Sequence, residues 1–381
     1  MQKKRTDPVK VELLIKPASY LCNLDCTYCF YKKTAAIYKA PCLMKPDILE
    51  KFISSVMEYS SGGPCMFSWQ GGEPLLAGID FYKKVVELQS LYGKSGQIVS
   101  NTVQTNGTLI DGDFVDFFRK YNVFVGLSLD GPPDVHNFYR KYPSGKGTFK
   151  EVMSKARLLE RNRIEFNILS TIGKETAKYP EKIYRFFLSE GFYYLQFIPA
   201  FDRKADRVRN FSVRPEDYGE FLCRLFDSWW NNGNPVASVR LFDNIVEILV
   251  GLEPGACSFK KRCGEYLVVE HNGDVYPCDF FVNPLFKMGN VTETPFPVLA
   301  ERVKKDFGRC KEDFPPEECG SCEWQFICNN GCLWHRWVES GDIKSGVADY
   351  LCPAYKRFFP HAMERLKALA GRIKAGGVSP S

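Results

Sequence analysis

Six short apolar segments, each followed by a longer amphipathic stretch, constrain the fold of this chain more than any other feature. The apolar segments are residues 11–15, 66–69, 98–104, 124–129, 166–172 and 194–198. The amphipathic stretches are residues 46–59, 81–92, 113–120, 149–159, 179–188 and 215–230. Strands that alternate with helices indicate a parallel sheet with crossover helices. Six units are fewer than the eight of a standard closed barrel, so we expect an α/β fold with an open or partial barrel.

The character of the sequence changes after about residue 250, where glycine, proline and cysteine separate short segments. Residues 268–276 predict a β-hairpin that turns at Asn272-Gly273. Residues 355–374 predict a final helix. We therefore expect two domains, a barrel over residues 1–250 and a cysteine-rich domain over residues 251–381.

Cysteine is the unusual part of the composition. The chain has 15 cysteines among 381 residues, with no secretory signal and no apolar run of the length that spans a membrane. We therefore expect a cytoplasmic protein without a membrane partner, whose cysteines serve as metal thiolates rather than disulfides. The net charge of +6 is spread without a polybasic block, which argues against a nucleic-acid partner.

Three cysteines near the start, Cys22, Cys26 and Cys29, have the spacing C-x3-C-x2-C. Three thiolates in one loop can hold three irons of a [4Fe–4S] cluster. The fourth iron then keeps an open position, which a catalytic metal needs and a closed structural site lacks. A zinc site that lacks its fourth ligand is the alternative.

This spacing, with the aromatic Tyr28 before the last cysteine, resembles the signature of the radical S-adenosylmethionine (SAM) superfamily. The resemblance implies that the open iron binds the amino and carboxylate groups of SAM. The reduced cluster then cleaves SAM to methionine and a 5′-deoxyadenosyl radical. The fold implied is a partial (β/α)6 barrel, in agreement with the count of strand–helix units.

Polar segments follow three successive predicted strands, at residues 70–74, 104–108 and 128–132. Parallel sheets bind their ligands at these strand ends, although each segment alone is also an ordinary turn. The first, Gln70-Gly-Gly-Glu-Pro74, resembles the GGEP motif that binds the SAM amino group. By resemblance we expect SAM contacts from Tyr28, Gly71, Gly72, Glu73, Ser128, Arg140 and Phe201.

Eight cysteines after residue 250, with Cys310 set aside, are enough for two fully ligated [4Fe–4S] clusters. Two four-cysteine zinc sites are the alternative that spacing leaves open. The pattern from Cys319 to Cys352 resembles the SPASM domain, which carries two auxiliary clusters. By that resemblance the first auxiliary cluster is held by Cys257, Cys263, Cys278 and Cys332, and the second by Cys319, Cys322, Cys328 and Cys352. Three [4Fe–4S] clusters and SAM are therefore the expected cofactors.

Segments along nearly the whole chain, such as residues 14–18, 166–169 and 273–279, resemble anaerobic sulfatase-maturating enzymes. The resemblance implies oxidation of a sulfatase cysteine or serine, in a Cys/Ser-x-Pro-x-Arg motif, to Cα-formylglycine. The 5′-deoxyadenosyl radical takes a Cβ hydrogen, and Asp279, which matches the family's base, takes a proton. The implied electron donor is reduced flavodoxin or ferredoxin, and we expect a monomer.

Two other functions remain open. SPASM enzymes also form thioether or carbon–carbon crosslinks in ribosomal peptides, and many of them carry an N-terminal leader-recognition domain. Only 21 residues precede Cys22, so we do not expect such a domain. A multi-metal nucleic-acid-binding module would need a basic stripe with interleaved aromatics, and the sequence shows none.

Overall fold

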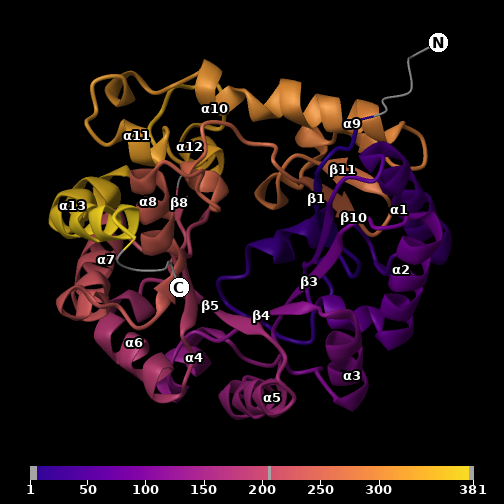
Figure 1. Cartoon of the computed structure of the whole chain (residues 1–381), viewed down its shortest axis with the longest axis horizontal. Helices are drawn as coiled ribbons and strands as arrows, with labels where there is room; N and C mark the ends of the chain where they lie inside the picture. The colour runs from indigo at the N-terminus through magenta and orange to yellow at the C-terminus, as the bar shows by residue number, and fades with distance from the viewer. Residues whose placement is uncertain (1–6, 205–206, 377–381) are drawn as a thin grey trace.

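A computed structural model describes residues 7–204 and 207–376 and contains a curved sheet of ten strands (Figure 1). The strand order is β12-β11-β10-β1-β2-β3-β4-β5-β6-β9. Its strands are β1 (Val11–Lys16), β2 (Cys65–Trp69), β3 (Val99–Thr105), β4 (Phe124–Ser128), β5 (Phe166–Ile172), β6 (Tyr194–Pro199), β9 (Ser238–Val239), β10 (Leu267–Glu270), β11 (Asp274–Tyr276) and β12 (Gly289–Asn290). A separate pair, β7 (Arg203–Lys204) with β8 (Arg207–Val208), is antiparallel.

The six expected strands are β1 to β6, and each lies within two residues of its predicted bounds. They pair in parallel and in sequence order, so their carboxyl ends meet at one edge of the sheet. The alternating burial of β1, β2 and β5 agrees with side chains that point to opposite faces of a sheet. The expected partial barrel is confirmed.

Helices cover the outer side of this sheet (Figure 1). They are α1 (Pro46–Ser60), α2 (Ile79–Tyr92), α3 (Gly112–Tyr121), α4 (Pro133–Tyr139), α5 (Phe149–Arg161), α6 (Pro180–Ser189), α7 (Pro215–Trp230) and α8 (Arg240–Val250). Local chemistry fixes several starts: prolines begin α1, α6 and α7, and the Asp111 side chain accepts a hydrogen bond from Phe114 N at the start of α3. Helices α4 and α8 are additions to the predicted set.

The expected hairpin is β10 and β11, but it does not stand apart from the barrel. Strand β10 pairs in parallel with β1, with Leu267 opposite Leu13. The cysteine-rich part therefore extends the barrel sheet, and the predicted division at residue 250 is not a break in the sheet. The division of the chain into a barrel domain and a cysteine-rich domain stays a prediction.

The remaining helices lie above the sheet in Figure 1, except the last, which returns to the barrel. They are α9 (Phe296–Arg302), α10 (Cys310–Asp313), α11 (Gln325–Cys328), α12 (Leu333–Ser340) and α13 (Cys352–Lys374). Helix α13 begins three residues earlier than expected, and its residues Phe358 and Leu366 pack into the same apolar core as α7 and α8. In the part of the chain that is described, no helix is long and apolar enough to cross a membrane.

Candidate functional site

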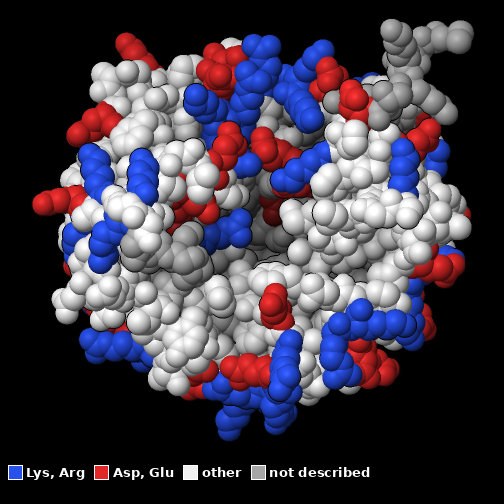
Figure 2. Space-filling view, in the orientation of Figure 1, with Lys and Arg blue, Asp and Glu red and all other residues white. Residues whose placement is uncertain are grey.

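The candidate site lies at the carboxyl edge of β1 to β4. Lys16, Gln70, Asn106 and Leu129 stand at or just beyond the ends of these strands. Figure 2 shows a hollow at the centre of this face of the molecule, with acidic and basic side chains around it, where Figure 1 places the inner side of the curved sheet. The polar segments that the sequence singled out therefore meet in one region.

The first three cysteines are gathered in the loop after β1. Burial raises the pKa of the Cys22 thiol to about 12, and nearby Cys26 and Cys29 add to that shift. Asn106, at the end of β3, directs its Nδ2 toward Cys22 Sγ at 3.8 Å. Three unpaired thiols within electrostatic reach of one another fit a cluster with three protein ligands.

The Gly71-Gly72-Glu73 segment packs directly under this cysteine loop. Gly72 has φ +48°, and a Cβ added there would lie 2.0 Å from the carbonyl oxygen of Leu21. Glu73 N donates a hydrogen bond of 2.7 Å to the same oxygen. Only glycine allows this approach, so the motif fixes the position of the residue before Cys22.

Glu73 is fully buried and ties the segment after β2 to the end of β3. Its carboxylate accepts hydrogen bonds from Leu75 N at 3.0 Å, Thr105 Oγ1 at 2.8 Å and Asn106 N at 2.8 Å. Burial raises its pKa to about 7, against the effect of these three donors. The described contacts of Glu73 are all structural, and its predicted contact with SAM stays a prediction.

Tyr28 and Arg140 meet on Asp130, which lies just after β4. The Tyr28 hydroxyl donates to Asp130 Oδ2, and Arg140 Nε lies 3.0 Å from Asp130 Oδ1. Burial lowers the Arg140 pKa, but Asp130, Tyr28 and Cys26 together outweigh this effect, so the Arg140 pKa is raised. Ser128 accepts a hydrogen bond of 3.0 Å from Gln104 Nε2. The expected SAM residues of this region are therefore held in place by Asp130, just after β4, and by Gln104 on β3.

Asp279 lies against the end of β1. Its Oδ2 is 3.8 Å from Nζ of the fully buried Lys16, and its Oδ1 accepts a hydrogen bond of 3.3 Å from the Tyr266 hydroxyl. Burial lowers the pKa of Lys16, and Asp279 and Glu270 oppose that shift. The side chain of Asp279 is thus oriented by two neighbours and sits beside Cys278.

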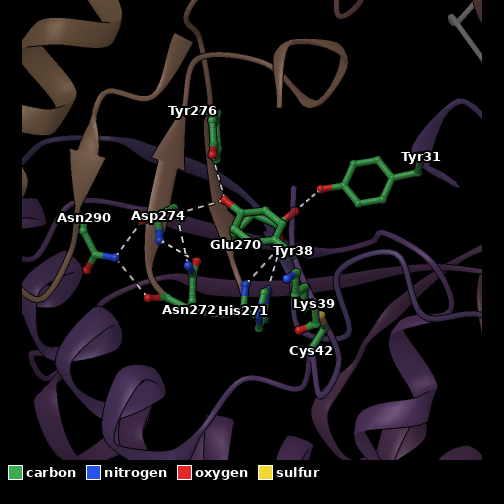
Figure 3. A network of polar contacts seen from close by, with 10 residues as sticks. All are labelled: Tyr31, Tyr38, Lys39, Cys42, Glu270, His271, Asn272, Asp274, Tyr276 and Asn290. Carbon is green, nitrogen blue, oxygen red and sulfur yellow. Dashed lines mark hydrogen bonds and ion pairs between the residues drawn. The ribbon is translucent and has the colours of Figure 1, made fainter. Parts of the chain in front are cut away.

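Figure 3 shows a buried polar network that contains Tyr31, Tyr38 and Glu270. The Tyr31 hydroxyl donates to Glu270 Oε1, while Glu270 Oε2 accepts from His271 N at 3.2 Å and contacts His271 Nδ1 at 3.1 Å. Tyr38 donates to Asp274 at 2.9 Å. Lys16 Nζ also lies 4.6 Å from the centre of the Tyr31 ring. The network joins the loop after β1 to the end of β10.

The four cysteines expected to hold the second auxiliary cluster line one pocket. Cys319, Cys322, Cys328 and Cys352 surround it together with Asn330, Asp349 and Tyr355. Cys319 ends a short 3-10 helix, Cys322 lies just after it, Cys328 ends α11 and Cys352 begins α13. A pocket walled by four thiols fits a fully ligated cluster.

The four cysteines of the first auxiliary set also lie near one another. Burial raises the pKa of Cys332, and Cys257 and Cys263 contribute to the shift; burial likewise raises that of Cys278, with contributions from Cys332 and Cys257. All 15 thiols are unpaired. Within the described ranges, no three His, Cys, Asp or Glu side chains are grouped so as to hold a single metal ion.

Phe201 occupies a different setting from the others. Its ring stacks on Tyr350 at 3.7 Å between centres, with an angle of 9° between planes, and meets His335 edge-on at 5.8 Å. One face of Phe201 is therefore covered by Tyr350. The expected contact of Phe201 with SAM stays a prediction, and it would use the other face.

Sequence reasoning missed Lys16 and Glu270 as members of this site, and it gave Asp130 no role of its own within the segment 128–132. A lysine that ends a buried strand, as Lys16 does before Pro17, is a signal that could have identified one of them. The other two became recognisable only when their partners were placed.

Comparisons with known proteins agree with this arrangement. The model of the Radical SAM superfamily matches residues 17–187, and that of an iron–sulfur cluster-binding domain, SPASM, matches residues 257–323. The serine-type anaerobic sulfatase-maturating enzyme of Bacteroides thetaiotaomicron is 36% identical, over 92% of this chain and 88% of that protein. The cysteine-type enzyme of Clostridium perfringens (strain 13 / Type A) is 38% identical, over 96% of this chain and 99% of that protein.

A solved structure is similar over the same extent. Native anSMEcpe with bound AdoMet and Cp18Cys peptide has a TM-score of 0.87 and 37% identity, and the match covers 96% of this chain and 100% of that one. Sequence and structure thus agree from the first cysteine loop to the last helix, and the chain belongs to the anaerobic sulfatase-maturating enzymes of the radical SAM superfamily.

Proposed function

We propose that this protein oxidises a cysteine or serine of a sulfatase to Cα-formylglycine. The observation that carries the proposal is the position of the Asp279 carboxylate, at the carboxyl edge of the barrel and directly after the predicted cluster ligand Cys278. Membership of a family with both cysteine-type and serine-type enzymes supports it.

The proposed cofactors are three [4Fe–4S] clusters and SAM. Cys22, Cys26 and Cys29 would hold the first cluster, and the residues after β2 and β4 would hold SAM. The two C-terminal cysteine sets would hold the auxiliary clusters. When bound, SAM and the clusters supply the radical that removes the Cβ hydrogen of the target residue and the centres that take up the second electron.

The chain's own residues supply the proton chemistry. Asp279 accepts the proton of the target thiol or hydroxyl at a carboxylate oxygen, as a general base does. Lys16, 3.8 Å away, stabilises the negative charge of that carboxylate, and the Tyr266 hydroxyl orients it. In total the target residue loses one hydrogen atom, one proton and one electron. Serine then becomes the aldehyde directly. Cysteine becomes a thioaldehyde, which water hydrolyses to the aldehyde.

The domain division at residue 250 follows from this chemistry: residues 1–250 would hold SAM and residues 251–381 the auxiliary clusters. We further propose a Cys/Ser-x-Pro-x-Arg substrate segment, reduced flavodoxin or ferredoxin as electron donor, a monomer, and a cytoplasmic location. Fifteen unpaired thiols support a reducing compartment.

The test uses the full chain, purified and reconstituted without oxygen, with two peptides that carry Cys-x-Pro-x-Arg or Ser-x-Pro-x-Arg. Mass spectrometry should show formylglycine in at least one peptide, together with 5′-deoxyadenosine. Formation of 5′-deoxyadenosine while both peptides stay unchanged would overturn the substrate assignment and favour another peptide modification, such as a crosslink.

The Asp279→Asn variant tests the base. We expect it to retain SAM cleavage and to lose formylglycine formation by roughly 100-fold or more, the lower end of the usual contribution of a general base. Asp306→Asn, at an exposed aspartate, is the matched control and should behave as wild type. Conversion by Asp279→Asn at the wild-type rate would exclude Asp279 as the base.

A further inference from the structure

Lys311, on α10, is a lysine with 0% exposure. Its Nζ reaches the loop that carries Cys257, where it donates a hydrogen bond of 2.7 Å to Ser258 O and another to Lys260 O. The ammonium group is therefore anchored within the loop that leads from Cys257 to Cys263, two predicted ligands of the first auxiliary cluster.

The backbone of Lys311 is tied to the second cysteine set. Asn330 Nδ2 donates a hydrogen bond of 3.3 Å to Lys311 O, and Asn330 lines the pocket that Cys319, Cys322, Cys328 and Cys352 surround. The neighbouring Asn329 donates to Phe259 O at 2.6 Å. Lys311 thus stands where the two cysteine sets adjoin.

Among the residues that the structure describes, no Asp or Glu makes an ion pair with Lys311 Nζ, whose hydrogen-bond partners are two backbone carbonyls. A buried ammonium that lacks a counter-charge is costly. The groups nearby that become anionic are thiols, because clusters bind cysteines as thiolates.

The electrostatics of the site point to the same groups. Burial lowers the pKa of Lys311, and the effects that oppose this come from Cys263, Cys332 and Cys257 of the first set and from Cys328 of the second. Both sets therefore act on one ammonium.

We propose that the Lys311 ammonium is a buried counter-charge shared by the two auxiliary clusters, and that it raises their reduction potentials. A positive charge in a medium of low dielectric favours the reduced, more negative cluster. Lys311 does not touch the substrate; it acts through the clusters and eases transfer of the electron that leaves the target residue. The role of Lys311 in electron transfer rests on the proposed function, whereas the measurement of the reduction potentials does not depend on it.

The test measures reduction potentials in the full chain, with Cys22, Cys26 and Cys29 replaced by alanine so that the auxiliary clusters alone give the signal. Electron paramagnetic resonance follows their reduction in a redox titration without SAM or peptide. Lys311→Gln keeps a hydrogen-bond donor without the charge, and Lys311→Met removes both. Lys304→Met removes a charge from an exposed lysine nearby and is the matched control.

We expect both Lys311 variants to lower the ratio of reduced to oxidised cluster about tenfold at a fixed potential, a shift of about 59 mV for one electron. Lys304→Met should leave the potentials unchanged. Unchanged potentials in both Lys311 variants would overturn the proposal, and so would a shift in Lys311→Met that Lys311→Gln does not share, because hydrogen bonds would then explain it.

Lys311→Arg covers the case in which neither variant retains its iron. Retention of iron and of the wild-type potential in Lys311→Arg would support the counter-charge, and loss of iron in all three would overturn it. Since neither SAM nor peptide is present, a failure of sulfatase maturation would leave this result intact, and the two proposals can fail separately.

Discussion

The distance between Gly72 and the cysteine loop predicts how a substitution at Gly72 changes stability and activity. In Gly72→Ala, the new Cβ would meet the Leu21 carbonyl oxygen at 2.0 Å, whereas real contacts of this kind do not fall below 3.0 Å. Both sides of the contact are backbone, so no side chain can rotate away. The loop that leads into Cys22 must therefore move by about 1 Å.

Three contributions set the stability change. An alanine at φ +48° costs about 1–2 kcal/mol. Loss of the 2.7 Å hydrogen bond from Glu73 N to Leu21 O costs about 0.5–1.5 kcal/mol. The lower entropy of the unfolded alanine chain offsets about 0.4–1 kcal/mol. We expect Gly72→Ala to lower the free energy of unfolding by about 2 kcal/mol, before any strain from the moved loop.

The effect on chemistry should exceed the effect on stability, because a displacement of 1 Å at a reacting centre can cost about 100-fold in rate. Urea unfolding of the apoprotein and 5′-deoxyadenosine formation by the reconstituted enzyme measure the two effects. Gly251→Ala is the control: φ is +90° and nothing lies within 4 Å of the added Cβ, so it should lose about 1 kcal/mol and keep SAM cleavage. If Gly72→Ala cleaves SAM as fast as Gly251→Ala, the argument from the Leu21 contact is wrong.

Two other predictions concern protonation and cluster ligation. The Glu73 pKa is raised from 4.5 to about 7, so the protonated carboxyl contributes stability that is fully present below pH 4.5 and is lost as the pH rises through 7. The free energy of unfolding of the wild-type apoprotein should therefore fall by up to about 3 kcal/mol over that pH range, and that of Glu73→Gln should not. Equal pH dependences of the two proteins would refute this prediction. Cys328→Ala should lose the iron and absorbance of one cluster, whereas Cys310→Ala, at a buried cysteine predicted not to be a ligand, should lose none; equal iron contents would contradict the ligand assignment.

The sequence predicted the parallel strands well because their signal is local. Residues 166–172 and 215–230 match β5 and α7 at both ends. The sequence could not predict which strand pairs with the edge of β1 that faces away from β2. Strand pairing over more than 200 residues depends on which edges remain open after folding, and no local pattern encodes that choice.

The site shows the same limit. Cys22, Glu73 and Asp279 were identified because motifs carry them. Arg336 and Lys311 are fully buried in the cysteine-rich part, yet in the sequence they read as ordinary basic residues on short helices. Their burial depends on the turns that the cysteines bring together, so it could be recognised only in three dimensions.

The pairing of β1 with β10 has a consequence for the synthesis of the protein. Leu13 leaves the ribosome early, but its partner Leu267 is added 254 residues later by residue number. At translation rates of 5–20 residues per second, one edge of β1 stays uncovered for roughly 10–50 s. During that interval an apolar strand edge is open to other nascent chains. Slow translation should therefore increase aggregation of newly made protein, however stable the finished sheet is, and chaperones that shield the first 100 residues should improve the yield.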